Sequence, residues 1–262
     1  MLSKNPLISI ILAVRNEEKS IDKCINSILN QNYKNFELLV IDDNSSDKTY
    51  QKIKIYSKKD KRISIYKSKN QVGLPKLLNF LIKITKGEFI ARVDGDDYWK
   101  KEKLKLQLNE IKIGAYDLIG CNAFFTNKNR IIGNSNLPIS HQEIKKNIYY
   151  FNPFLHSSVI FRKKKKFDYF YDESFTKCQD YEMWSRMIMS GYKVKNLKKK
   201  LIYNSLDKKT SLLTIYFSIL VKNNILKNNK SNIDPFKIHL IYWIIKNFIK
   251  KLFSIKKVLF KI

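Results

Sequence analysis

The chain has 262 residues, 44% of them hydrophobic, and its 51 lysines and arginines against 23 acidic residues give a formal charge of +28. This length and hydrophobic content predict one sizeable core with an appendage, or two small lobes, and they exclude a fibre or a disordered chain. Three widely spaced cysteines exclude a disulfide framework and a Cys-rich zinc site, which favours a reducing compartment.

The first ninety residues alternate between strand and helix patterns. Leu7–Val14 is a nearly continuous aliphatic run, as expected of a strand covered on both faces, and apolar side chains then recur every three or four residues up to Leu29, as in a helix with one buried face. Further strands are expected at Phe36–Ile41, Ile63–Tyr66 and Phe89–Val93, with helices at Thr49–Tyr56 and Leu74–Ile84. This alternation predicts an α/β fold with a mainly parallel sheet and right-handed crossovers.

Polar clusters follow three of these strands, at Ala13–Asn16, Asp42–Asn44 and Asp94–Asp97. In open α/β sheets, ligands bind beyond the carboxyl ends of the strands. We therefore expect the three clusters to form one site.

The third cluster gathers Asp94, Asp96 and Asp97 around one glycine. Carboxylates this close repel one another unless a cation or hydrogen-bond donors compensate them. Oxygen ligands of this kind suit Mg²⁺ or Mn²⁺, which commonly bind one or two carboxylates together with substrate phosphates. The cluster predicts a site for a metal and a diphosphate, and the alternative is a solvated turn.

Four ordered segments resemble the successive motifs of the family 2 glycosyltransferases, which have the GT-A fold: Pro6–Glu17, Ser27–Tyr33, Glu37–Thr49 and Ala91–Asp97. The resemblance implies a GT-A catalytic domain at residues 1–205, with a Rossmann-like sheet flanked by helices. Within it, residues 1–115 would form the nucleotide-binding half and residues 116–205 the acceptor half.

The resemblance also implies roles for single residues. Ala13 and Arg15 would border the base of the nucleotide, and Asp43 would accept a hydrogen bond from it, as a carboxylate can from a uracil N–H. Asp94 would lie near the ribose or the metal, and Asp96 would ligate Mn²⁺ or Mg²⁺. UDP is therefore the expected carrier, with GDP and dTDP as alternatives.

Two further residues near these motifs have two interpretations each. Lys76 belongs to a segment that resembles the family's glycine-containing helix start, and it either approaches a phosphate or lies on a solvated helix face. Asp42 either belongs to the site or bonds the backbone amides of the turn that follows it, as Asp readily does.

From Tyr116 the alternation weakens. Strands are expected at Tyr116–Phe125 and Arg130–Gly133, and a helix at Ser140–Tyr150 with Ser140 as its N-cap. The segment Asn152–Arg162 resembles the family segment that leads to the acceptor side. His156 within it either contacts substrate or is a packed, hydrogen-bonded residue.

A helix pattern surrounds Asp180, because apolar side chains share one face at Tyr181, Trp184, Met187 and Ile188. On spacing alone, Asp180 would be an N-cap or a carboxylate favoured by the helix dipole. The resemblance implies instead that Asp180 is the general base, and it places Glu182 and Trp184 on the acceptor side. Gln179 stands where the family commonly has an acidic residue.

Transfer of a sugar from a nucleoside diphosphate needs a cation on the leaving diphosphate and a base at the acceptor hydroxyl. A single displacement, with these on opposite faces of the sugar, inverts the anomeric centre. Together with the resemblance, this chemistry predicts an inverting, metal-dependent transferase that adds one sugar to a glycan or lipid-linked acceptor in surface polysaccharide synthesis, such as lipopolysaccharide or capsule. Asn204 and Leu206 stand where family members often carry Arg and His.

Residues 206–262 form a basic C-terminal region with helices expected at 208–229 and 234–262. The second is amphipathic and carries Trp243, which suits an anionic membrane surface. The alternative is packing on the catalytic domain or on a second subunit. Since the chain also lacks a signal-peptide pattern, we expect it in the cytoplasm, peripheral on the inner face of the cell membrane.

The charge allows a different class of function, a basic nucleic-acid or membrane-binding α/β protein without transferase activity. Only six of the 51 basic residues are arginine, the preferred reader of bases and phosphates. The carboxylates at the strand ends would also repel a nucleic acid. Nucleic acid is therefore not an expected partner, and the lysine content can equally reflect the composition of the genome.

Overall fold

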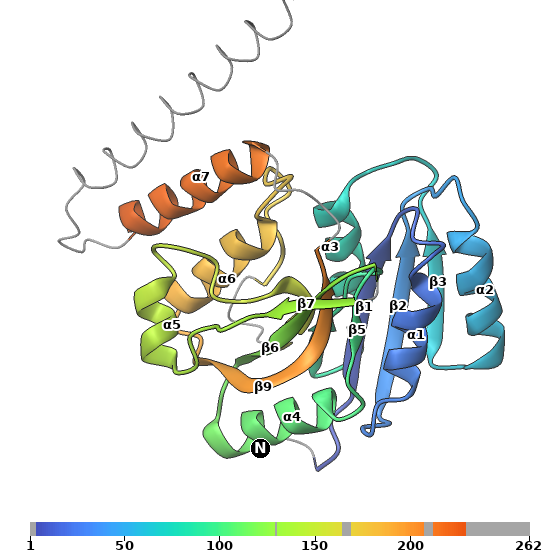
Figure 1. Ribbon diagram of the computed structural model, residues 1–262, viewed down its shortest axis with the longest axis horizontal. Coiled ribbons are helices and arrows are strands. Elements are labelled where there is room, and N and C mark those ends of the chain that lie inside the picture. The colour runs from blue at the N-terminus through green and yellow to red at the C-terminus, as the bar shows by residue number, and fades with distance from the viewer. Residues whose placement is uncertain (1–3, 129, 164–168, 207–211, 229–262) are drawn as a thin grey trace, which may run out of the picture.

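The computed structural model describes residues 4–128, 130–163, 169–206 and 212–228. They form one nine-stranded sheet with helices packed on both of its faces (Figure 1). The strands are β1 Ile8–Val14, β2 Phe36–Asp42, β3 Ile63–Lys67, β4 Phe89–Arg92, β5 Tyr98–Trp99, β6 Leu118–Asn127, β7 Arg130–Asn134, β8 Ile160–Arg162 and β9 Val194–Ser205. The α-helices are α1 Ile21–Leu29, α2 Thr49–Lys59, α3 Leu74–Ile84, α4 Lys103–Gly114, α5 His141–Asn147, α6 Gln179–Met189 and α7 Leu212–Asn228.

The expected α/β architecture is confirmed, and the sheet has two parts. Strands β3, β2, β1 and β4 lie in that order and are all parallel. The sheet continues as β8, β6, β9 and β5, where β8 runs antiparallel to both β4 and β6 and only β6 with β9 is parallel. The mainly parallel pairing that the sequence predicts therefore describes the first half, while the second half is mixed.

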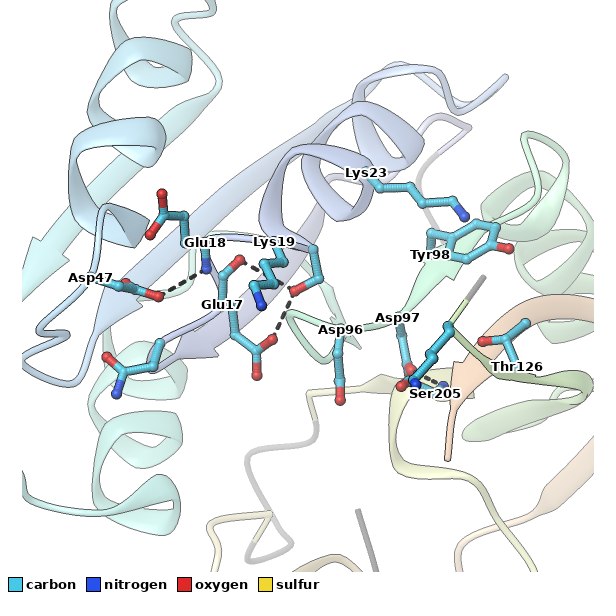
Figure 2. A pocket seen from close by; sticks show the side chains of 13 residues that line it. Glu17, Glu18, Lys19, Lys23, Asp47, Asp96, Asp97, Tyr98, Thr126 and Ser205 are labelled. Atoms are coloured by element: carbon cyan, nitrogen blue, oxygen red, sulfur yellow. Dashed lines mark hydrogen bonds between the residues drawn. The ribbon is translucent and has the colours of Figure 1, made fainter. Parts of the chain in front are cut away.

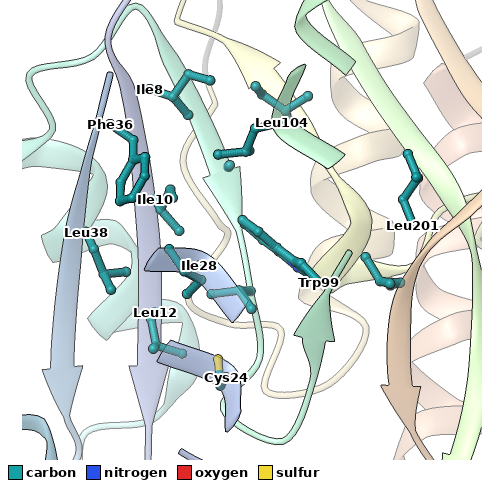
Figure 3. Close-up of a cluster of buried hydrophobic side chains, with 14 of the residues drawn as sticks. Ile8, Ile10, Leu12, Cys24, Ile28, Phe36, Leu38, Trp99, Leu104 and Leu201 are labelled. Atoms are coloured by element: carbon teal, nitrogen blue, oxygen red, sulfur yellow. The ribbon is translucent and has the colours of Figure 1, made fainter. Parts of the chain in front are cut away.

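Strand β1 lies in the middle of the sheet and explains the aliphatic run at the start of the chain. All seven of its residues are buried. Since successive side chains of a strand point to opposite faces, Ile8, Ile10 and Leu12 join α1, α2 and α4 in one layer of the core (Figure 3), while Ile11 and Ala13 join α3 and α6 in the other. Continuous hydrophobicity was thus a direct signal of a central strand.

Helix α5 begins as the sequence predicts, with Ser140 as its N-cap. The Ser140 side chain accepts a hydrogen bond from the Glu143 backbone amide, and the Glu143 carboxylate accepts one from the Ser140 backbone amide. This reciprocal pair satisfies two amides that the first turn of a helix leaves free.

Helix α7 packs against α6 with Val221 and Ile225 buried in the same core layer as Trp184. The part of the basic C-terminal region that the structure describes is therefore part of the fold. The helix expected at 234–262 lies outside the described residues. Among the helices that the structure does describe, none combines the length and apolarity that crossing a bilayer requires.

Candidate active site

A cleft of about 160 Å³ lies at the carboxyl ends of β1 and β4. The strand order reverses there, because β2 and β3 lie on one side of β1 and β4 on the other. This is the position at which open α/β sheets bind ligands. The three polar clusters expected to converge do so, and the cleft is lined by Ala13, Val14, Arg15, Glu17, Asp43, Leu74, Leu77, Asp94, Gly95 and Asp96.

The loops that follow β1 and β2 are tied together by hydrogen bonds. Asn16, with a φ of 55°, donates its backbone N–H to Ser45 Oγ at 3.0 Å, and its side-chain oxygen accepts from the Ser46 backbone amide at 2.9 Å. Asp42 is fully buried and accepts from the Ser45 backbone amide at 2.9 Å. Asp42 is therefore the turn residue that the alternative interpretation predicts, and Asp43 is the carboxylate of this loop that lines the cleft.

Asp43 also fixes the opposite wall of the cleft. Its carboxylate accepts hydrogen bonds from the backbone amides of Val72 at 2.9 Å and Gly73 at 3.3 Å, directly before α3. Gly73 has a φ of 90°, a backbone conformation that residues other than glycine rarely adopt. The carboxylate holds the start of α3 against β2, and the side chain is only 5% exposed.

A buried arginine compensates part of the carboxylate cluster. Arg92, at the end of β4, is fully buried and places Nη2 2.6 Å from Asp94 Oδ1. The Asp94 backbone amide donates to Ser157 Oγ at 3.1 Å, which fixes this residue on a second side. Three neighbouring carboxylates require a compensating positive charge, and Arg92, at the end of the strand that precedes them, supplies part of it.

The oxygen donors at the cleft suit a divalent metal bound together with a diphosphate. Asp94 and Asp96 both line the cleft, from either side of Gly95. Within the described ranges, no three His, Cys, Asp or Glu side chains gather in a way that would hold a metal by themselves. Mg²⁺ and Mn²⁺ commonly use one or two carboxylates and complete their shell with phosphate and water, so this donor set fits the group.

Asp97, the third carboxylate, faces a different cleft. Its oxygens accept from the Ser205 backbone amide and from Asn204 Nδ2, both at 2.8 Å, which joins it to the end of β9. Figure 2 shows it reaching Ser205, with Asp96 drawn between Glu17 and Asp97. This second cleft, of about 760 Å³, shares Glu17 and Asp96 with the first. Burial, followed by the charges of Asp94 and Asp96, raises the pKa of Asp97 to about 8.

Asp180 lies in the first turn of α6, whose N-cap is Cys178, so Asp180 is not the N-cap itself. Its Oδ2 accepts a hydrogen bond from Asn152 Nδ2 at 2.7 Å. Burial raises the pKa of the Asp180 carboxyl above its ordinary value, and the charge of Asp94 adds to the rise. Asp180 itself lines neither of the two clefts.

His156 is a packed residue in this structure. Its Nε2 lies 2.8 Å from the hydroxyl of Tyr171, and its ring makes edge contacts with those of Tyr171 and Trp184. Burial, with the positive charge of Arg92 second, lowers the pKa of His156 to about 3. The imidazole is thus neutral at physiological pH and packs against Trp184 of α6.

Comparisons with known proteins agree with this arrangement. The family model of glycosyl transferase family 2 matches residues 9–170. The chain belongs to glycosyl transferase family 2. It is 30% identical over 246 residues to the uncharacterized glycosyltransferase MJ1057 of Methanocaldococcus jannaschii, with 91% of this chain and 84% of the relative covered.

A second relative is the Escherichia coli UDP-Glc:alpha-D-GlcNAc-diphosphoundecaprenol beta-1,3-glucosyltransferase WfaP, 28% identical over 95% of this chain and 96% of that protein. Among solved structures, S. aureus TarS 1-349 in complex with UDP-GlcNAc superposes with a TM-score of 0.69 at 22% identity, covering 86% of this chain and 68% of that one. The likeness to TarS shows a shared GT-A fold.

Five of the expected site residues of this family 2 glycosyltransferase line neither of the two clefts: Asp180 and His156, described above, and Trp184, Glu182 and Lys76. Trp184 has no exposed surface and packs in the core, so its side chain cannot contact an acceptor. Glu182 pairs with Arg186 at 2.9 Å and lines a groove between α6 and α7. Lys76 is exposed and lines neither of the two clefts, which agrees with a solvated helix face.

The sequence analysis missed two residues that contact the expected site residues directly, Arg92 at Asp94 and Asn152 at Asp180. The sequence did indicate a role for Arg92. A charged residue inside an apolar strand needs a buried partner, and a carboxylate follows Arg92 two residues later. Asn152 had no local signal, because its partner Asp180 is 28 residues away.

Proposed function

We propose that this chain transfers one sugar from a UDP-linked donor to a hydroxyl of a glycan carried on a lipid diphosphate, with inversion at the anomeric carbon. The observation that carries the proposal is the convergence of Asp43, Asp94 and Asp96 on one cleft at the switch point of the sheet. The donor and acceptor named for WfaP and the UDP-GlcNAc complex of TarS support it.

In this proposal the nucleotide lies across the end of β1. Ala13 and Arg15 border the base, and Asp43 accepts from a ring N–H with a carboxylate that the amides of Val72 and Gly73 already orient. The base binds to a wall that is fixed before the ligand arrives. Preorganisation of this kind reduces the entropy cost of binding.

The diphosphate lies toward Gly95. Asp96, with Asp94, would hold Mn²⁺ or Mg²⁺, and the ion would neutralise the charge that develops on the leaving diphosphate. Arg92 holds Asp94 in place through the 2.6 Å contact with its carboxylate.

Asp180 removes the proton of the acceptor hydroxyl as that oxygen attacks the anomeric carbon. A base is most effective when its pKa is close to the working pH, and burial raises the pKa of Asp180 in this direction. With the leaving diphosphate on one face of the sugar and Asp180 on the other, the displacement inverts the centre.

A screen of nucleotide sugars tests the proposal. We expect UDP-sugars to be consumed when a GlcNAc-diphosphopolyprenol analogue and Mn²⁺ are present, to be consumed far more slowly without the acceptor, and to be untouched with EDTA. GDP-mannose and dTDP-sugars serve as donor controls, and NMR of the product reports the anomeric configuration. A product that retains the donor configuration would contradict the proposed inversion. Turnover of GDP-mannose and of no UDP-sugar would contradict the assignment of uracil as the nucleobase.

Replacement of Asp43 should weaken binding of the base and loosen α3. For Asp43→Ala we expect about tenfold weaker UDP binding, because the base loses an acceptor, and about 1 kcal/mol lower stability, because two amides before α3 lose theirs. Isothermal titration with UDP and urea unfolding measure the two effects. The matched control is Asp60→Ala, whose carboxylate contacts Arg62 on a distant loop; it should leave UDP binding unchanged.

We also propose that the basic C-terminal region brings the enzyme to an anionic membrane, where a lipid-linked acceptor resides. Liposomes that contain phosphatidylglycerol should retain the full chain, and a chain truncated after Asn229 should lose that retention. Equal retention of both would favour packing on the catalytic domain or a second copy of the chain. Retention on purely zwitterionic liposomes would contradict the electrostatic part of the argument.

A further inference from the structure

The side chain of Asn152 contacts the proposed base directly. Asn152 is half-buried in the segment that follows α5, and its Nδ2 lies 2.7 Å from Asp180 Oδ2. A neutral donor to a carboxylate at this distance makes a charge-assisted hydrogen bond, which is stronger than one between neutral groups. It therefore restrains rotation of the Asp180 carboxylate.

A second hydrogen bond fixes which way the Asn152 amide points. Its Oδ1 accepts from the backbone N–H of Phe154 at 3.2 Å. Exchanging the amide oxygen and nitrogen would place an N–H against this donor and an oxygen against the carboxylate, so both contacts would become repulsive. The amide group must therefore present its N–H₂ to Asp180.

The backbone that carries Asn152 is held from two other elements. The carbonyl of Pro153 accepts from Nδ2 of Asn196 at 2.9 Å, and Asn196 is fully buried in β9. The ring of Phe154 is 2% exposed and packs edge-on against Trp184 of α6. Trp184, which does not reach the cleft, thus helps to support the residue that contacts the base.

We propose that Asn152 is the positioning residue of the catalytic base, holding Oδ2 of Asp180 so that the carboxylate stays ionised and aimed at the acceptor hydroxyl. The inference rests on the role of Asp180 under the proposed function. In this role Asn152 need not contact either the sugar donor or the acceptor.

The groups that act on Asp180 come from several elements. The charge of Asp94 raises the pKa of Asp180, while hydrogen bonds from the Tyr181 backbone amide and from Asn152 lower it against the larger effect of burial. After burial, the charge of Asp180 in turn raises the pKa of Tyr171 and of Cys178, while the charges of Lys177 and Lys222 lower that of Cys178. Of these groups, Asn152 is the one whose hydrogen bond a substitution can remove without changing a charge.

Two substitutions at position 152 test the assignment through the pH dependence of kcat. Asn152→Ala removes a donor to the ionised form, so the acid limb should move up by about one pH unit. Because the carboxylate also loses the contact that orients it, kcat above the limb should fall about tenfold, while KM for the UDP-sugar should stay within about twofold. Asn152→Asp keeps the shape of the side chain and adds a carboxylate beside Asp180, so its acid limb should move further up.

The control variant Asn196→Ala loosens the same backbone segment and leaves the contact with Asp180 in place. It should lower the unfolding temperature without moving the acid limb. An acid limb that is unchanged in Asn152→Ala, or that moves equally in Asn196→Ala, would overturn the positioning role. Should Asn152→Ala fail to fold, the isosteric Asn152→Asp decides, and an unmoved limb in it also overturns the role.

Asp180→Asn distinguishes an error in the proposed base from an error in the role of Asn152. If it retains most of the transferase rate, the proposed base is wrong and the role of Asn152 is lost with it. If it is inactive while the limb of Asn152→Ala is unmoved, the inference about Asn152 fails and the proposed function stands.

Discussion

Asp180→Asn should reduce kcat by about 10² to 10⁴-fold, the range over which general base catalysis contributes. The amide has almost the shape of the carboxylate and can still occupy the first turn of α6, but it cannot take up the proton of the acceptor hydroxyl. Affinity for UDP should stay within about threefold, because the proposed nucleotide contacts lie at the ends of β1 and β2. Stopped assays of glycan product together with calorimetry of UDP binding measure both quantities.

Asp172→Asn is the matched control for this prediction. Asp172 is exposed, and its carboxylate accepts from the backbone amide and hydroxyl of Ser174 within a turn that precedes α6. The same change of Asp to Asn there should leave kcat within about twofold. An Asp180→Asn enzyme that keeps most of its rate, or a comparable loss in Asp172→Asn, would refute the assignment of the base.

Lys103→Met should stabilise the protein, and by more at low pH than at high pH. Lys103 in α4 is fully buried, and its ammonium has no hydrogen-bond partner within the part of the chain that the structure describes. It lies 3.8 Å from the centroid of the Trp99 ring, which compensates the charge only in part. Burial lowers the pKa of Lys103 from 10.5 to about 7.

The sign of the effect follows from the protons bound in each state. Below about pH 10 the unfolded chain protonates Lys103, whereas the folded chain does so only below about pH 7, so the folded state loses stability as pH falls between these values. At 1.36 kcal/mol per pKa unit, the cost reaches about 5 kcal/mol at pH 6. Methionine fills a similar volume without the charge and should remove this cost.

Urea unfolding of the wild type and of Lys103→Met at pH 6 and pH 9.5 measures the difference. The free energy of unfolding should rise by about 5 kcal/mol at pH 6 and by only about 1 kcal/mol at pH 9.5. Lys105→Met, an exposed position on the same helix, should change it by less than about 0.5 kcal/mol at both values. A gain that does not depend on pH, or a loss at pH 6, would contradict the prediction.

The alternating half of the fold could be predicted from sequence because its signals are local. Strand β1 is hydrophobic without interruption since both of its faces are covered, and α3 was placed at its observed bounds because a glycine and a proline mark its start. Strand β8 has only three residues and β5 only two, so neither is long enough to show a period. The mixed strand pairing of the second half depends on contacts between distant segments, so no local sequence pattern could predict it.

By itself, the sequence determined the parallel first half of the sheet, the polar clusters at its strand ends and their resemblance to family 2 motifs, because strand period and strand ends are properties of adjacent residues. Only the tertiary structure decided which carboxylates face the cleft. Asp42 and Asp97 are turned away by hydrogen bonds to the Ser45 and Ser205 backbone amides, and Trp184 is drawn into the core. For Asp42 the sequence left two interpretations open. For Asp97 and Trp184 the sequence could not decide, because each depends on partners that lie far away in the chain.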